Sequence, residues 1–184
     1  MRFRAQVRKR VTRRKWGAVK ARCRTLVNPF GLRGICVHYS GTLSDYRPNH
    51  AECDDVVRSF QRFHMAPGGL GVPQGGCDIA YNHLICPHGH TFVGRGFRNQ
   101  SGANGTSDSN RKYHSVCMLG GDKVGRKDIT PEAQESLRHY RQRFVTLFPH
   151  ARRVAWHSLF ASSGCPGDEL RAMIRRMFPK NAGA

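Results

Sequence analysis

The chain has 184 residues, enough for one domain with a hydrophobic core and short for two. Hydrophobic residues make up 39% of it, with ten Phe and two Trp, which excludes a disordered basic tail. No segment approaches the ~18 apolar residues of a membrane span. The formal net charge of +19 requires a polyanionic partner, for which nucleic acid, anionic lipid and acidic cell-wall polymer all qualify.

The N-terminal segment is strongly basic. Residues 1–25 carry eleven of the 31 Lys and Arg and no acidic residue, which is typical of a solvated arm. No apolar segment of the signal-peptide kind follows the first arginines. We therefore expect synthesis in a host cytoplasm without a signal peptide, and a basic arm over residues 1–25 that leads into one domain over residues 26–180.

The seven cysteines are odd in number, and none forms a CxxC pair. Several lie in apolar runs, as in residues 34–37 and 116–119. This pattern favours buried thiols in a reducing compartment over a disulfide framework. A bridge between Cys53 and Cys77 remains as an alternative.

In the first half of the chain, apolar runs and turn residues predict four elements. Residues 34–38 read as a buried strand that ends at a histidine. Residues 51–65 have helical apolar spacing with acidic residues in the first turn, where the helix dipole favours them. After a Gly/Pro-rich loop, residues 79–86 read as a second strand, with residues 91–93 as its hairpin partner.

In the second half, residues 97–113 are predicted to form a long loop before a strand at 115–119, and loops of this length are usually functional or disordered. Thr130-Pro131 predicts a helix start, with Leu137, Tyr140, Phe144 and Leu147 facing inward. A strand follows at 154–156, and Cys165-Pro166 opens a last helix. Strands and helices alternate without repeats, so we expect a single α/β domain.

Two of these strands end in a histidine, at His38 and His157, and Cys165 follows eight residues after the second. Strand ends in α/β sheets meet along one edge, where ligands normally bind. Two imidazoles and one thiolate make a catalytic type of zinc site with an open fourth position. A helix N-terminus at Cys165 would also stabilise its thiolate.

Ordered motifs extend this interpretation over nearly the whole chain, from about residue 11 to residue 175. They are WGA (16–18), VHYSGT (37–42), VRSFQRFHM (57–65), DIAYN (78–82), GRG (94–96), VCMLGG (116–121), and a histidine at 157 followed by CPG (165–167). Together they resemble the peptidoglycan recognition and type 2 N-acetylmuramoyl-L-alanine amidase family. The segment 105–121 is similar to phage endolysins that attack actinobacterial walls.

The resemblance implies a central mixed β-sheet flanked by helices, and a Zn²⁺ ion held by His38, His157 and Cys165. It implies hydrolysis of the amide between the lactyl group of N-acetylmuramic acid and L-alanine, at the bacterial wall after release from the cytoplasm. Tyr81 matches the tyrosine that stabilises the developing oxyanion. Ser163 stands where relatives carry lysine or threonine, and it lacks the charge of a lysine.

Two further residues are candidate substrate contacts. Asn104 follows Gly102-Ala103, where relatives often carry a histidine, and Arg95 lies in the GRG motif. The alternatives for these two side chains are a role in loop structure and a structural ion pair.

Other readings compete with this one. A non-catalytic peptidoglycan-binding module of the same fold is one, although such relatives typically lack the cysteine ligand that Cys165 supplies. A nucleic-acid-binding protein explains the charge but none of the motifs, so no nucleic-acid partner is expected.

The remaining cysteine and histidine residues do not predict a second metal site. The cluster Cys86-Pro87-His88-Gly89-His90 lacks a fourth ligand at suitable spacing for zinc. His64 reads as a core histidine, and His50, His139 and His150 as surface or loop residues.

The charge has a use in an amidase because bacterial envelopes are polyanionic. We expect a monomer that binds peptidoglycan and holds anionic envelope polymers or lipids through basic patches. The basic residues expected to do so are residues 1–25, Arg171, Arg175 and Arg176.

Overall fold

The computed structural model describes residues 10–41, 49–120 and 129–183, so the start of the basic arm, residues 1–9, lies outside the described residues. The strands are β1 (Arg10–Val11), β2 (Gly34–Tyr39), β3 (His83–Ile85), β4 (Thr91–Val93), β5 (Tyr113–Met118) and β6 (Arg153–Trp156). The α-helices are α1 (Cys53–Met65), α2 (Ser107–Lys112), α3 (Pro131–Leu147) and α4 (Asp168–Met177). Among these described segments, no helix has the length and apolar character needed to cross a membrane.

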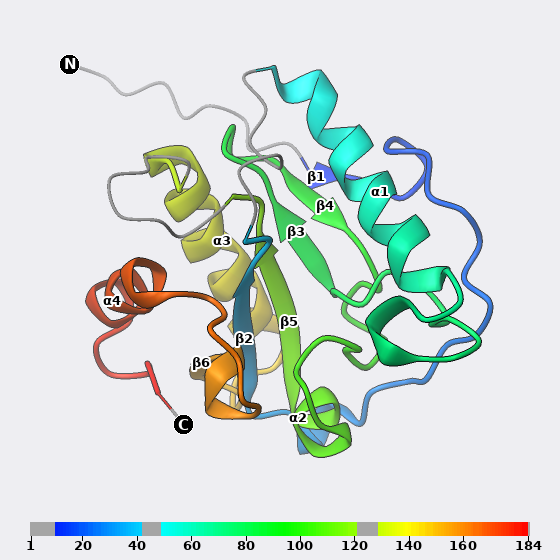
Figure 1. The fold of residues 1–184 in the computed structure, drawn as a ribbon. Helices are drawn as coiled ribbons and strands as arrows, with labels where there is room; N and C mark the ends of the chain where they lie inside the picture. Colours follow the sequence, from blue (N-terminus) through cyan, green and yellow to red (C-terminus); the bar gives the residue numbers. More distant parts are fainter. Residues whose placement is uncertain (1–9, 42–48, 121–128, 184) are drawn as a thin grey trace.

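The strands form one mixed sheet in the order β1-β4-β3-β5-β2-β6. Only β3 and β4 pair antiparallel among the described strands, and the other neighbours are parallel. Helix α1 crosses one face of this sheet and α3 lies behind the other (Figure 1). The expected α/β domain with a central mixed sheet is confirmed.

The central strands β2 and β5 are covered on both faces, which explains their nearly continuous apolar sequences. Their alternate side chains enter two separate cores. Val37 and Met118 pack with α3 and α4, whereas Cys117 packs with Trp16 and α1. Because successive side chains on a strand point to opposite faces, His38 lies on the α1 face beside Cys117, its partner in register.

The predicted cap explains where helix α3 begins. The Thr130 side chain accepts a hydrogen bond from the Ala133 N–H, and Pro131 takes the first turn of α3. Leu137, Tyr140 and Phe144 are buried as expected. Leu147 is not: it ends α3 and is 49% exposed.

The first described residues are built into the domain. Val11 and Trp16 belong to the core under α1, and Arg10–Val11 pairs with β4. The packed domain therefore begins well before residue 26, where the arm was expected to end. Cys23 forms a disulfide with Cys77, which excludes the Cys53–Cys77 alternative and corrects the expectation that all the cysteines are thiols.

Two local expectations also change. The second strand is shorter than residues 79–86, since β3 covers only His83–Ile85. The predicted loop 97–113 contains α2, whose N-cap Thr106 forms a reciprocal capping box with Ser109. The polar, Ser- and Asn-rich composition of this helix concealed it, because the helix has no apolar stripe of its own.

Candidate functional site

The structure brings His38, His157 and Cys165 together on the α1 face of the sheet. Val37 pairs with Trp156 across β2 and β6, so the next residues, His38 and His157, lie side by side. Their ring centroids are 4.8 Å apart. The Cys165 Sγ atom is 3.7 Å from His38 Nδ1, and the ligand atoms of all three side chains lie within 4.8 Å of one another.

The His38 ring is held in one tautomer by Asn104. The Asn104 side-chain NH₂ donates to the carbonyl oxygens of Ser109 (3.1 Å) and Tyr113 (2.8 Å). Its Oδ1 therefore faces His38 Nε2, at 2.9 Å, and must accept a hydrogen bond from it. With the proton on Nε2, the lone pair of His38 Nδ1 points toward Cys165, as a metal ligand requires.

Burial sets the protonation states of the group. It lowers the pKa of His38 to about 3 and also lowers the pKa of His157, so both rings are neutral at pH 7. Burial raises the pKa of the Cys165 thiol to about 11, and this outweighs the Tyr39 backbone N–H and the charge of Arg171. The expected thiolate stabilisation by a helix N-terminus is wrong, because α4 begins only at Asp168.

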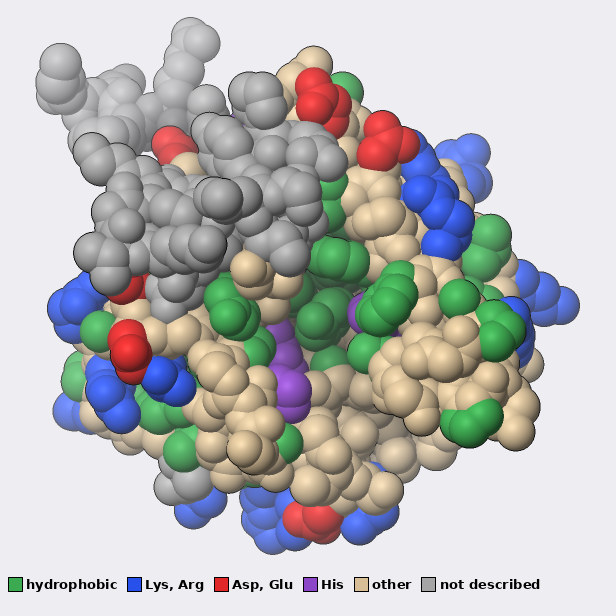
Figure 2. Space-filling view, viewed as in Figure 1, with side chains coloured by type: hydrophobic (Ala, Val, Ile, Leu, Met, Phe, Trp, Pro, Cys, Tyr) green, Lys and Arg blue, Asp and Glu red, His purple; other side chains and the backbone are tan. Residues whose placement is uncertain are grey.

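A cavity of about 570 Å³ opens above the three side chains. Its lining includes His38, His157 and Cys165 together with Tyr39, Ser40, Leu70, Tyr81, Ala103, Asn110 and Ser163. Figure 2 shows a hollow on this face, with histidine side chains at its floor and hydrophobic side chains around them. A donor group at the floor of a cavity of this size can contact a small ligand.

Tyr81 and Ser163 lie in the cavity wall beside the group. The Tyr81 ring meets the His38 ring edge-on, with centroids 5.4 Å apart, and also contacts His64. Ser163 Oγ accepts a hydrogen bond from the Cys165 N–H at 3.1 Å, so this hydroxyl orients the cysteine loop.

Arg95 and Asn104, the expected substrate contacts, do not line the cavity. Arg95 donates to the carbonyl oxygens of Ile79 (2.8 Å) and Gln100 (3.3 Å) and holds the surrounding loops together. Asn104 is fully buried behind His38. Its positioning role was not evident in the sequence, because it depends on backbone carbonyls five and nine residues away.

No family model matches the sequence, but individual known proteins are similar to it. The chain is 28% identical to N-acetylmuramoyl-L-alanine amidase of Sus scrofa over 168 residues, which are 88% of this chain and 26% of that protein. It is 33% identical to peptidoglycan-recognition protein SC1a/b of Drosophila simulans over 89 residues, 48% of this chain and 43% of that protein. The chain therefore spans less than half the length of these relatives.

Solved structures share the whole architecture. The ectodomain complex of peptidoglycan recognition proteins LCa and LCx bound to tracheal cytotoxin superposes with a TM-score of 0.80 at 20% identity, over 95% of this chain and 98% of that one. Drosophila PGRP-LB gives 0.77 at 19% identity, over 92% and 94%. The fold is that of the peptidoglycan recognition proteins.

The chain contains a second group of potential metal ligands, formed by His50, Cys53, Cys86 and His88. The sequence indicated only half of it. The cluster Cys86-Pro87-His88-Gly89-His90 lacks a fourth ligand at suitable spacing in the sequence, and His50 has the context of a surface or loop residue. The missing partners come from the start of α1, more than thirty residues earlier in the chain.

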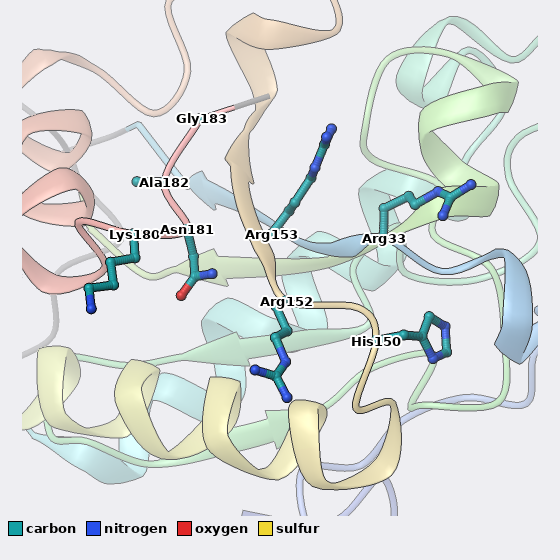
Figure 3. Close-up of a pocket in the computed structure, with 8 residues that line it drawn as sticks. All are labelled: Arg33, His150, Arg152, Arg153, Lys180, Asn181, Ala182 and Gly183. Atoms are coloured by element: carbon teal, nitrogen blue, oxygen red, sulfur yellow. The ribbon is translucent and has the colours of Figure 1, made fainter.

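A second cavity, of about 520 Å³, is basic (Figure 3). Its lining includes the exposed side chains of Arg33, Arg152, Arg153 and Lys180, which come from the segment before β2, from around the start of β6 and from the C-terminal segment. Four cationic side chains around one hollow form a patch suited to anionic groups.

Proposed function

We propose that this chain is a zinc-dependent N-acetylmuramoyl-L-alanine amidase, and that it serves as a phage endolysin. The substrate would be the amide between the lactyl group of N-acetylmuramic acid and the L-alanine of the stem peptide. The observation that carries the proposal is the His38, His157 and Cys165 group at the floor of a cavity of about 570 Å³. Similarity to the porcine amidase supports the reaction, and the residues at 105–121 support the endolysin class.

The residues present fit a catalytic zinc ion. His38 and His157 are neutral imidazoles, Cys165 supplies sulfur, and Asn104 accepts a hydrogen bond from His38 Nε2 and so orients the ring. Among the described residues three donors converge here, and the cavity lies on their open side. A zinc ion bound there would supply an activated water and polarise the scissile carbonyl.

The chain's own residues would position the substrate and stabilise charge. Tyr81 stands beside His38 in the cavity wall, where its phenol can donate a hydrogen bond to the oxyanion that develops on the scissile carbonyl. The Ser163 hydroxyl accepts from the Cys165 N–H, so its own proton can be donated into the cavity. Asn104 keeps the proton of His38 on Nε2 throughout.

Peptidoglycan binding without hydrolysis is the second candidate function. Two of the similar structures, those of LCa with LCx and of LE, hold tracheal cytotoxin, which the latter describes as monomeric diaminopimelic acid-type peptidoglycan. The complete set of three donors at the cavity floor favours hydrolysis over binding alone.

The basic surface would hold the enzyme on its insoluble substrate. Arg33, Arg152, Arg153 and Lys180 surround the second cavity, and the net charge of the chain is +19. We assign this surface to anionic envelope polymers or lipids, which a monomer made in a host cytoplasm would meet after its release.

Mass spectrometry of digested peptidoglycan tests the proposal. Purified walls treated with the zinc-loaded protein should show new L-alanine amino termini and intact glycan strands, and Cys165→Ser should abolish the new termini. Cleaved glycosidic bonds would refute the amidase assignment. Wall binding without any new amino termini would establish the binding module instead.

A further inference from the structure

The second group joins two segments on the α1 face of the sheet. His50 lies in the 3₁₀ turn His50–Glu52, and Cys53 is the first residue of α1. Cys86 and His88 lie in the tight turn between β3 and β4, where the Cys86 N–H donates to the His90 carbonyl and the Gly89 N–H donates to the Cys86 carbonyl. The hairpin turn therefore presents its two donors toward the start of α1.

The distances within the group match the edges of a tetrahedron around zinc. Cys86 Sγ lies 3.6 Å from His50 Nδ1 and 3.8 Å from His88 Nδ1, and Cys53 Sγ lies 3.6 Å from His88 Nδ1. With Zn–S bonds of ~2.3 Å and Zn–N bonds of ~2.0–2.1 Å, neighbouring ligand atoms lie about 3.3–3.8 Å apart. All four ligand atoms fall within 4.8 Å of one another.

The surroundings favour a closed site. Both cysteines are fully buried in the core under α1, and both histidines are partly buried. The His50 ring packs against His90, with centroids 3.4 Å apart, and against Phe92. A set of two sulfur and two nitrogen donors favours zinc over hard cations such as Mg²⁺ or Ca²⁺.

We propose that His50, Cys53, Cys86 and His88 form a structural Zn²⁺ site that ties the start of α1 to the β3–β4 turn. Four protein ligands leave no position for a reacting water, so this ion stabilises the fold and takes no part in hydrolysis. The Cys23–Cys77 disulfide anchors the segment that follows α1, so the helix is held near both of its ends.

Metal analysis of the full chain tests this site independently of the catalytic one. The wild-type protein, purified with reductant and zinc, should hold about two zinc ions, and a His157→Ala, Cys165→Ser variant should keep about one. X-ray absorption at the zinc edge of that variant should show two sulfur and two nitrogen neighbours. Absence of zinc from the His157→Ala, Cys165→Ser variant would overturn the proposal, and so would a zinc ion in it that has no sulfur neighbours.

Cys53→Ser provides the second measurement, with Cys117→Ser as its matched control. Cys117 is equally buried in the same core but lies outside the group. Cys53→Ser should lose about one zinc ion and Cys117→Ser none. A disulfide between Cys53 and Cys86 would also overturn the site, if it forms in protein purified without reductant and remains after zinc is added.

The two proposals can fail separately. If the wild type holds one zinc ion and the His157→Ala, Cys165→Ser variant retains it, the structural site stands and the catalytic zinc site fails.

Discussion

The two metal-ligand groups of this chain share the α1 face of the sheet but differ in what surrounds them. His38, His157 and Cys165 lie at the floor of a 570 Å³ cavity, with one ring oriented by the buried Asn104. The other group places two fully buried cysteines between a helix start and a hairpin turn. The number of ligand atoms and their access to a cavity thus distinguish a site that can contact a substrate from one that can only hold segments together.

The largest contrast should come from removing one cysteine of each group. Cys165→Ser should reduce the release of L-alanine amino termini to background while lowering the thermal unfolding midpoint less than Cys86→Ser does, since the Cys165 side chain faces a cavity. Cys86→Ser should do the reverse. It should lower the unfolding midpoint, by ~2–4 °C for each kcal/mol lost, and retain activity per folded molecule. Equal effects of the two substitutions on both measurements would remove the distinction between the groups.

Tyr81→Phe should have the next largest effect. It removes the phenol that is placed beside His38 and leaves all metal ligands intact. Loss of one oxyanion donor costs ~10²–10³ in rate, so kcat should fall by this factor while the zinc content stays constant. A simultaneous loss of zinc would instead show that Tyr81 supports the metal group.

Asn104→Ala should weaken the three-donor group by removing the acceptor for the His38 Nε2–H. Loss of a hydrogen-bond partner that orients a metal ligand typically costs ~10–100-fold in metal affinity or activity. A competition titration with a zinc indicator should show this loss at one of the two sites only. Circular dichroism must confirm folding, because the Ser109 and Tyr113 carbonyls also lose a donor. Unchanged affinity at both sites would refute the orienting role.

Ser163→Ala should have the smallest effect. It removes one hydrogen bond, from the Cys165 N–H, which contributes about 1 kcal/mol. Steady-state rates on a soluble muropeptide should therefore fall by less than ~10-fold. A loss as large as that of Tyr81→Phe would assign Ser163 a direct contact with the transition state.

The sequence predicted the parts of this molecule whose signal is local. The apolar runs in β2 and β5, the cap at Thr130 and the histidines near the ends of β2 and β6 could all be predicted, because each depends on a few neighbouring residues. The resemblance to a known family then indicated that Cys165 lies at the same edge of the sheet as the two histidines.

The rest depends on contacts between distant segments. No spacing rule pairs Cys23 with Cys77, 54 residues away, or brings His50 and Cys53 to the β3–β4 turn. The sequence marks Asn104 as a candidate substrate contact, but its hydrogen bond with His38 joins residues 66 positions apart, which no local pattern indicates. The expectation that a helix N-terminus lowers the pKa of Cys165 was wrong for a similar reason, since burial against other segments raises the pKa of this thiol.

The parallel pairing of Val37 with Trp156 constrains how this region can evolve. An insertion or deletion of one residue inside either strand would turn one imidazole to the opposite face of the sheet, because side chains alternate along a strand. Natural variants should therefore differ by substitutions within β2 and β6, and should take up changes of length in the connections on either side. Engineers who graft new loops onto this scaffold should keep both strand lengths fixed.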